Sequence, residues 1–301
     1  MTWRFLDFAR NDNHVLRGLL NYNTSVLFVL LFLPLCAHAT EVQPLAELPR
    51  EQLRVFLKGY MGDWRTETDQ RKGLPAPPAA QPVPTHAKRM ALPHPETLDL
   101  GTMPLKDAIV RRRSVRAYAA EPLTRAELSF LLWCTQGVAK VDRDAEGRIV
   151  NQYRTVPSGG ARHPFETYLL LNRVEGLVPG IYRYLPHEHA LIQIREDAAL
   201  APRIKAACYG QTAPPQAAVV FVWTAVPYRT EWRYGPIAHR MIAIEAGHVC
   251  QNLYLAAESI GAGVCAMLAY NQVKMDALIG VDGKEEFAIY MAPVGKKVAN
   301  E

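Results

Sequence analysis

The sequence predicts an α+β fold, and three observations support that class. The 301 residues are 49% hydrophobic and 21% charged, a composition that suits one main globular domain with a substantial core. The segment from residue 236 to 260 is apolar on several sides, which is typical of a long central helix that is buried. Predicted strands and helices follow one another without the βαβ regularity of a parallel sheet, and this mixture favours the α+β class.

The chain begins with a segment that is similar to an export signal. Residues 25–39 read SVLFVLLFLPLCAHA, an apolar run followed by the small-x-small pattern of a signal-peptidase site. We expect cleavage after Ala39, so that residues 1–39 are removed and the protein is periplasmic or secreted. An uncleaved membrane anchor is the alternative, although the run is shorter than the roughly 20 residues that a spanning helix needs. A misassigned start codon would instead leave the protein in the cytoplasm.

Residues 40–97 predict an N-terminal arm. A short amphipathic stretch at 48–61 is followed by 73–95, which holds seven prolines with almost no apolar periodicity, as in an extended linker. The main domain is then expected to span residues 98–301.

The elements of this domain follow from local patterns. Residues 105–113 predict a helix whose cationic last turn suits the helix dipole. Thr124 and Glu127 have the spacing of a capping box and open a helix toward Gly137. Further helices are predicted at 200–209, 236–260 and 272–279. Runs of β-branched, aromatic and aliphatic residues predict strands at 165–171, 180–184, 217–222, 264–270 and 287–294.

Three polar residues interrupt the apolar central helix. Glu245, His248 and Asn252 lie on one stripe of it, at i, i+3 and i+7. Burial would require them to hydrogen-bond one another or a ligand. We expect an internal network, with a ligand as the alternative.

Composition and motifs exclude several classes of site. The formal net charge of +5 is concentrated in one arginine run, which favours a small anionic ligand over nucleic acid. Gly261-Ala262-Gly263 follows a helix and precedes a strand, the reverse of the dinucleotide-binding context. His187-Glu188-His189 lies in a predicted turn without a third ligand at a recognisable spacing, so no metal site is expected. The cysteines after residue 39 lack CxxC spacing and are expected to be buried small hydrophobes: Cys134, Cys208, Cys250 and Cys265.

Three separated motifs point together to a phosphorylated cofactor. Residues 111–116 read RRRSVR, which places four arginines and a serine hydroxyl where they could donate to a phosphate. Residues 157–163 read PSGGARH, and a Ser-Gly-Gly turn lets the backbone approach a flat ligand closely. Lys296 and Lys297 add charge near the C-terminus. The alternative for the arginine run is a solvated basic helix end.

The order of the motifs resembles the nitroreductase superfamily of flavin enzymes, and within it the SagB/ThcOx-type dehydrogenase branch, over residues 56–297. The resemblance is carried by RRRSVR at 111–116, RTVPSGGARHPFE at 154–166, WRYG at 232–235, EAGHVCQNLYLAAESIGAGVCAM at 245–267 and APVGKK at 292–297. It implies a mixed central sheet flanked by helices and an interlocked homodimer with FMN at the subunit interface.

The resemblance also implies roles for individual residues. The FMN phosphate and ribityl chain would be held by Arg112, Arg113, Ser114, Arg116, Lys296 and Lys297. The isoalloxazine of the partner subunit would lie along Pro157, Ser158, Gly159 and Gly160. Leu268 and Ala269 would face the other edge of the ring, near N5 and O4, and Ala269 stands where many members have glycine. A cation near N1 would stabilise the reduced ring, and Arg154 or Arg162 could supply it.

One position departs from the branch. The azoline oxidases use a Lys-Tyr pair as catalytic acid and base at the motif where this chain has Arg233-Tyr234. Arginine keeps its proton, so Arg233 cannot act as a general base, although it could orient an anionic substrate. Tyr234 could still exchange a proton. The alternative is a surface Arg-Tyr pair without a catalytic role.

The expected function is that of an FMN-dependent oxidoreductase that transfers hydride in ping-pong fashion through flavin N5 to or from a small organic substrate, with NAD(P)H as a candidate electron donor. The alternatives are an azoline-type dehydrogenase that acts on a modified peptide and a flavin-binding protein without turnover. No nucleic acid is expected as a partner, and a membrane only if residues 1–39 are retained.

Overall fold

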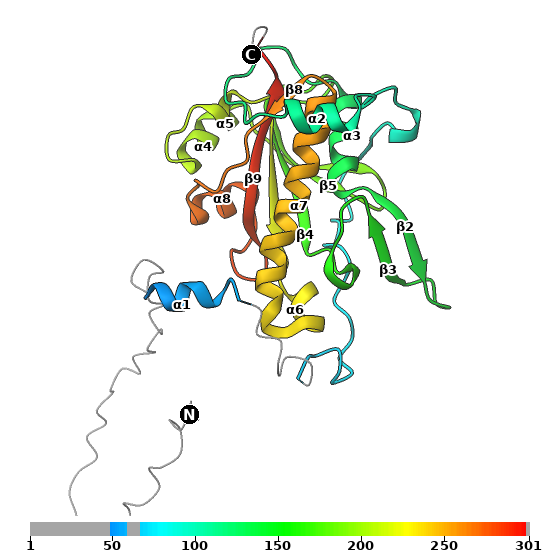
Figure 1. Ribbon diagram of the computed structural model, residues 1–301. Coiled ribbons are helices and arrows are strands. Elements are labelled where there is room, and N and C mark those ends of the chain that lie inside the picture. The colour runs from blue at the N-terminus through cyan, green and yellow to red at the C-terminus, as the bar shows by residue number, and fades with distance from the viewer. Residues whose placement is uncertain (1–48, 59–66, 299–301) are drawn as a thin grey trace, which may run out of the picture. The chain divides into compact units, whose positions relative to one another are not determined.

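The computed structural model describes residues 49–58 and 67–298 (Figure 1). The expected signal or anchor, residues 1–39, lies outside the described residues, and so does part of the amphipathic stretch at 48–61. Its described part forms α1 (Arg50–Val55), in which every side chain is exposed. Within the described ranges, no helix has both the length and the apolar character needed to cross a membrane.

A seven-stranded sheet forms the centre of the described domain, with the order β1-β6-β5-β4-β7-β9-β8. Its strands are β1 (Arg89–Ala91), β4 (Phe165–Leu171), β5 (Gly180–Leu185), β6 (Ala190–Glu196), β7 (Val219–Ala225), β8 (Ala262–Val264) and β9 (Phe287–Lys296). We expected a mixed sheet, but every pairing between these described strands is antiparallel. Short turns join β4 to β5 and β5 to β6, and such hairpins reverse the chain between neighbours. Parallel neighbours occur among the described residues only as isolated bridges, at Ser114–Val264 and Leu123–Val174.

Helices cover both faces of the sheet, which confirms the α+β class. Figure 1 shows α7 running along one face, while α4, α5 and α8 gather on the other. The α-helices of this domain are α2 (Leu105–Arg111), α3 (Arg125–Gln136), α4 (Leu200–Ala207), α5 (Ala213–Gln216), α6 (Tyr228–Tyr234), α7 (Ala238–Ser259) and α8 (Gln272–Ile279). Short 3-10 helices lie at Pro95–Thr97, Gly159–Ala161 and Gly235–Ile237.

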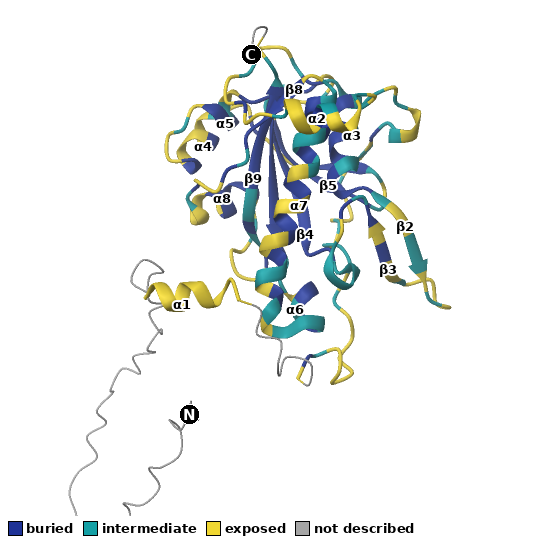
Figure 2. Ribbon diagram, in the orientation of Figure 1, coloured by how far each residue is buried: buried dark blue, intermediate teal, exposed yellow. Residues whose placement is uncertain are grey.

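The strands divide their side chains between two hydrophobic cores. On β4, Leu169 and Leu171 pack in the core beneath α3 and α7, while Tyr168 and Leu170 pack in the core beneath α4 and α8. This alternation follows from the two-residue period of a strand. Because both faces are covered, β4 and β7 are buried along their whole length, as Figure 2 shows in dark blue.

Local sequence signals explain the helix ends. Thr124 accepts from the Glu127 N–H, and Glu127 accepts in return from the Thr124 N–H, so the expected capping box is confirmed. Asn271 caps α8 in a similar way by accepting from the Lys274 N–H. At its other end, α8 stops at Gly280 in the left-handed conformation, with φ of 84°.

Two sequence-based predictions about elements were wrong. The strand expected at 264–270 is only β8, because Pro293 in the facing strand β9 has no N–H to return to the ladder. The central helix α7 is buried on its sheet side only. Its other side exposes small or apolar residues together with two polar ones, Ala243, Ile244, Gly247, His248 and Gln251.

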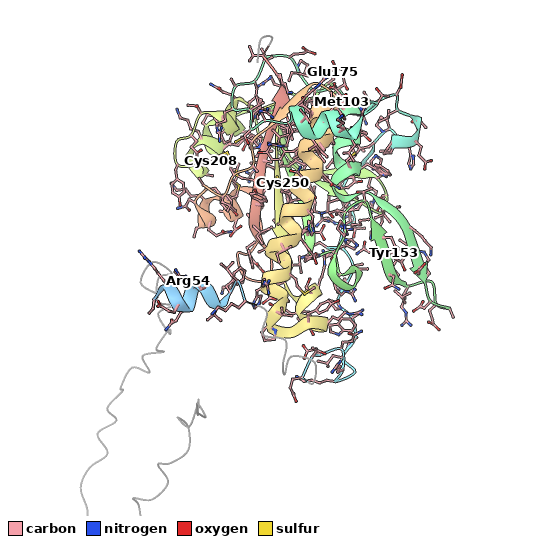
Figure 3. The ribbon with its side chains drawn as sticks, viewed as in Figure 1. Arg54, Met103, Tyr153, Glu175, Cys208 and Cys250 are labelled. Carbon is pink, nitrogen blue, oxygen red and sulfur yellow. The ribbon has the colours of Figure 1, made fainter. Side chains whose placement is uncertain are left out.

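A two-stranded hairpin that the sequence did not predict extends away from the main sheet (Figure 1). It consists of β2 (Val138–Arg143) and β3 (Ile149–Arg154). Tyr153, labelled in Figure 3, projects from this hairpin and donates to Asp142 at 2.9 Å. The hairpin leads directly into the PSGGARH segment and so fixes where that segment starts.

The proline-rich part of the arm is held against the domain by polar groups. Its backbone carbonyls accept from Arg229 at Pro78 (3.0 Å) and from Arg183 at Pro82 (2.7 Å). Gln81 donates its N–H to Glu166, which also pairs with Arg229 at 2.5 Å inside the protein. Farther on, residues 89–91 of the arm form edge strand β1 beside β6. These anchors also hold α6, on which Arg229 lies.

Candidate active site

The arginine run lines a cavity at the end of α2. This cavity of about 770 Å³ is lined by Arg111, Arg113, Ser114, Val115, Arg116, Ala117, Glu258 and Lys297. The helix ends because Arg112 adopts φ of −46° and ψ of 125°, which turns the chain into an extended course. Val115 then donates its N–H to Val264 at 2.9 Å, so the run lies beside β8.

The charge of this cavity is strongly positive. Three arginines and one lysine line it, and Glu258 is its one carboxylate among the described residues. Lys297 donates to Glu258 at 2.6 Å and largely neutralises it. The remaining guanidinium groups and the Ser114 hydroxyl are the donors that a phosphate requires.

The predicted phosphate residues do not all occupy this cavity. Arg113, Ser114, Arg116 and Lys297 line it. Arg112 instead places its guanidinium 5.2 Å from the centre of the Tyr254 ring, and Lys296 forms an ion pair with Glu127 on α3. Arg111 is one of the four arginines of the predicted run, although the family resemblance gave it no role, and it lines the cavity because α2 ends there.

Tyr254 on α7 connects the arginine run to the segment after β8. Its hydroxyl lies 3.0 Å from the Ser114 Oγ and accepts from the Ala266 N–H at 2.8 Å. One side chain therefore fixes both Ser114 and the start of the segment that carries Leu268 and Ala269. Its one sequence signal is a polar hydroxyl on an otherwise apolar helix, which is too weak to identify it.

Leu268 and Ala269 lie on the surface after β8. The Leu268 side chain is 71% exposed, and Ala269 accepts from the Gln211 side chain at 2.9 Å through its carbonyl. Met267 and Met291 exchange two backbone hydrogen bonds, which holds the base of this segment to β9. The segment thus presents the exposed residues Leu268 and Ala269 from a fixed base.

The PSGG segment is held by Glu245 of α7. Glu245 accepts from the Ser158 hydroxyl and from the Gly159 N–H, both at 2.7 Å. Burial raises the pKa of Glu245, and these two hydrogen bonds offset part of that shift. Pro157, Ser158 and Gly159 line a second cavity of about 330 Å³ together with Met241, Ile244, Glu245 and His248 of α7.

The sequence left open whether Glu245, His248 and Asn252 contact protein groups or a ligand. The polar stripe on α7 was expected to bond within itself, but Glu245 and Asn252 instead bond to groups outside α7. Asn252 donates to the carbonyls of Cys134 and Thr155 at 3.0 and 3.2 Å, and Thr155 precedes in sequence the residues that Glu245 contacts. His248 is exposed and lines the second cavity.

Side chains of α6 and α7 pack closely against the two glycines. A Cβ on Gly159 would lie 2.1 Å from the Met241 Cε. Gly160 has φ of 58°, and a Cβ there would lie 2.7 Å from the Tyr234 hydroxyl and 2.9 Å from the Arg233 side chain. Arg233 and Tyr234, at the end of α6, therefore lie directly against the glycine turn.

Arg154 is not available to a ligand. It is 8% exposed and donates to Gln136 at 2.5 Å and to Gln152 at 3.2 Å, within the core. Burial lowers its pKa to about 10. The Arg154 donors are therefore used inside the protein, and its role as a cation near the flavin ring stays a hypothesis. Arg162 remains a candidate for the cation near flavin N1, since its side chain is only partly buried.

The other titratable groups give no further site. Across the described residues, no cluster of three or more His, Cys, Asp or Glu could hold a metal ion. Cys208, Cys250 and Cys265 are buried thiols, and burial raises the pKa of Cys250 to about 12. Figure 3 shows Cys208 near α4 and Cys250 on α7.

The two cavities lie toward opposite halves of α7. Glu245 lines the smaller one and Glu258 the larger one, and these residues are thirteen positions apart on the helix. At 1.5 Å of rise per residue, this spacing corresponds to about 20 Å. Within one chain, the glycine turn is therefore remote from the arginine-lined cavity.

The fold and the cationic cavity define an α+β protein with a built site for an anionic ligand. A model of the family described as "Nitroreductase family" matches residues 109–296, more than half of the chain. The chain therefore belongs to the nitroreductase family, which confirms the resemblance found in its motifs.

Two relatives extend this result. A protein of Methanocaldococcus jannaschii that has the name of a nitroreductase is 33% identical over 200 residues, which are 66% of this chain and 94% of that protein. The trifolitoxin-processing protein TfxB of Rhizobium leguminosarum bv. trifolii is 30% identical over 131 residues, which are 37% of this chain and 33% of that protein. The similarity to TfxB is consistent with the SagB-type branch.

Solved structures share the fold. A protein of Ralstonia eutropha JMP134 with the name of a nitroreductase aligns with a TM-score of 0.56 and 25% identity, over 75% of this chain and all of that one. For a similarly named protein of Anabaena variabilis the TM-score is 0.54 and the identity 27%, over 64% of this chain and 38% of that one. The Escherichia coli microcin synthetase McbBCD complex, with truncated pro-MccB17 bound, aligns with a TM-score of 0.53 and 20% identity, over 73% of this chain and 84% of that one.

Proposed function

We propose that the protein is an FMN-dependent oxidoreductase that passes hydride through flavin N5 to or from a small organic substrate, in two half-reactions of ping-pong type. The observation that carries this proposal is the cavity of about 770 Å³ lined by three arginines, a lysine and a serine hydroxyl. Its donors match a doubly charged phosphate, and its one lining carboxylate within the described chain is already paired with Lys297. The residues present therefore fit the phosphate end of FMN.

Several side chains would hold the phosphate and the ribityl chain. Arg113 and Arg116 supply charge, and the Ser114 hydroxyl supplies a short donor. Tyr254 keeps Ser114 and the Ala266 N–H in place, and the Arg112 guanidinium over its ring restricts its motion. When bound, FMN supplies the hydride chemistry, and the protein tunes it by charge and hydrogen bonds.

We further propose that the isoalloxazine lies between two subunits of a homodimer. The separation of about 20 Å along α7 keeps the glycine turn of one chain away from its own arginine-lined cavity. A second copy could bring its own glycine turn to that cavity. Exposed apolar side chains on α2 and α7 favour such a contact, since Leu105, Val110 and Ile244 are 65%, 63% and 50% exposed.

Tyr234 is the proposed proton-exchanging residue. Its hydroxyl lies against the Gly160 turn, along which the resemblance places the isoalloxazine, so it could exchange a proton with a substrate bound there. Arg233 keeps its proton and acts by its charge. Glu245 holds the turn through Ser158 and Gly159, so it positions the loop instead of reacting.

The visible absorption spectrum tests the cofactor. We expect the purified chain to be yellow, or to become so on reconstitution with FMN, with an absorption maximum typical of oxidised flavin. Anaerobic NADPH should then bleach the flavin if NAD(P)H is the electron donor. A colourless chain that cannot be loaded with FMN would contradict the proposal.

A second candidate function is dehydrogenation of an azoline in a modified peptide. It is favoured by the similarity to the trifolitoxin-processing protein and by the fold shared with the microcin synthetase complex. Arginine at position 233 counts against it, because the base of that reaction would be missing. A flavin-binding protein without turnover is the third candidate, and it predicts tight FMN binding with no reduction by any donor.

We also propose that the protein acts outside the cytoplasm, after loss of residues 1–39. The support for this is the apolar run and the Ala37-His38-Ala39 pattern. Mass spectrometry of the protein isolated from its native host tests this, and a mature chain that starts at Thr40 is the expected result. A full-length chain in the membrane fraction would favour the anchor instead.

A further inference from the structure

Two arginines at the glycine turn form no ion pair with the described residues. Arg162 follows Gly160 by two residues, and Arg233 is the next-to-last residue of α6. In the described part of the chain, neither guanidinium forms an ion pair within 4.0 Å, whereas Lys296, Lys297 and Arg229 all do.

Aromatic rings fix the position of both guanidinium groups. Arg162 lies 5.1 Å from the centre of the Trp232 ring, and Arg233 lies 5.7 Å from that of Tyr234. The Arg233 side chain also reaches within 2.9 Å of the point where a Cβ of Gly160 would lie. The two arginines therefore converge on the turn that would lie against the flavin.

This convergence has an electrostatic cost that the described protein does not offset. The nearby carboxylate of Glu245 already accepts from Ser158 and Gly159. The Arg162 Nε is buried without a hydrogen-bond partner, and burial together with the charge of Arg233 lowers the pKa of Arg162. An oxyanion placed between the two guanidinium groups would relieve their repulsion.

We propose that Arg162 and Arg233 form a carboxylate-binding subsite beside the Gly160 turn, so that the substrate is a small organic molecule that carries a carboxylate. Planar guanidinium groups match a carboxylate in geometry and can bind it through paired hydrogen bonds. This inference deepens the proposed function and rests on it for the reaction, but the binding of an anion is a property of these side chains themselves.

Binding of a matched pair of probes tests the subsite without turnover. Benzoate and benzamide have nearly the same shape and differ in charge. Titration into the wild-type protein, followed by tryptophan fluorescence with a Trp232→Phe control, should show benzoate binding at least tenfold more tightly, as expected for one or two charge-assisted hydrogen bonds. Equal affinity for both probes would overturn the proposal.

Substitutions of the two arginines test whether the preference for benzoate over benzamide depends on them. Arg233→Gln and Arg162→Gln should each reduce benzoate affinity about tenfold and leave benzamide unchanged, while Arg233→Lys should keep part of the preference because it keeps the charge. Arg148→Gln, on the exposed hairpin and paired with Asp144, is the matched control and should change neither. A loss of both probes in equal measure would mean a structural role for the arginines and would overturn the proposal.

Turnover gives the second readout. With the FMN-loaded protein, 4-nitrobenzoate should have a kcat/KM at least tenfold above that of 4-nitrobenzamide, with the difference in KM, and Arg233→Gln should remove it. If the protein takes no FMN, the fluorescence titration still reports the subsite, so the two proposals fail separately. If the variants instead slow only reduction by NADPH, the arginines serve the phosphates of the electron donor, and the carboxylate assignment is wrong.

Discussion

The two cationic regions of this protein differ in how their charge is compensated and in how they are assembled. The cavity at residues 111–117 is built mainly from one continuous run, and acidic residues pair with the lysines that border it. The glycine turn brings together two distant stretches, residues 157–163 and the consecutive helices α6 and α7, and its two arginines lack acidic partners within the described residues. The cavity presents three arginines that form no ion pair among the described residues, which suits a doubly charged phosphate, whereas the two guanidinium groups at the turn suit a singly charged group. This difference suggests where the cofactor ends and where the substrate begins.

The largest expected effect is at the arginine-lined cavity. Arg113→Ala combined with Arg116→Ala should weaken FMN binding by a factor of at least 100, because two charge-assisted contacts contribute about 1.5–3 kcal/mol each. The dissociation constant, measured by quenching of flavin fluorescence, checks this. Arg148→Ala is the control, and unchanged FMN affinity in the double variant would remove the cavity from the cofactor site.

The close packing of Tyr234 against Gly160 can be tested by an alanine substitution. Gly160→Ala should destabilise the protein by about 1–3 kcal/mol more than Gly147→Ala, because only the first substitution forces a Cβ against Tyr234. Both glycines have positive φ, 58° and 80°, so the cost of backbone strain is shared and the difference isolates the contact. Urea unfolding curves measure it, and equal midpoints would show that α6 moves aside freely.

Tyr254 connects the cavity to the segment after β8, so removal of its hydroxyl tests whether the arginine-lined cavity and the glycine turn bind their ligands independently. Tyr254→Phe should weaken FMN binding about fivefold, since roughly 1 kcal/mol is expected for the lost hydrogen bonds to Ser114 and Ala266. It should leave the preference for benzoate unchanged. Tyr209→Phe, at a side chain that is 66% exposed, serves as the control. If benzoate binding fell as well, the two regions would not be independent.

The smallest expected effect is a pH dependence at Glu245. Burial raises its pKa in the folded protein above the ordinary value of 4.5, so the unfolded chain releases this proton first as the pH rises. Stability should therefore fall as the pH passes upward from the ordinary value to the raised one. Glu245→Gln should flatten this part of the curve of unfolding free energy against pH. An identical slope in the variant would show that other buried groups, such as Glu286, cause it.

Much of the fold could be predicted from local patterns. The capping box at Thr124, the helix at 272–279 and the strand at 165–171 depend on neighbours a few residues away, and the structure has them where they were expected. The hairpin at 138–154 was missed, because its exposed strands lack the apolar alternation that marks a half-buried strand. The open side of α7 was missed because small and apolar residues give no sign of which face another chain or solvent meets.

The sequence by itself determined the class of the protein and the nature of its charge: a family whose motifs follow in order, and an arginine run with a serine inside it. Such signals can be recognised in the sequence because each motif lies within six or seven neighbouring residues. Only the tertiary structure decided that Arg112 and Lys296 turn to Tyr254 and Glu127 and that Arg154 is used inside the core. It also decided that Arg162 and Arg233 converge with no acid among the described residues beside them. The physical reason is that charge compensation acts through space over a few ångströms, and the partners come from segments far apart in the chain.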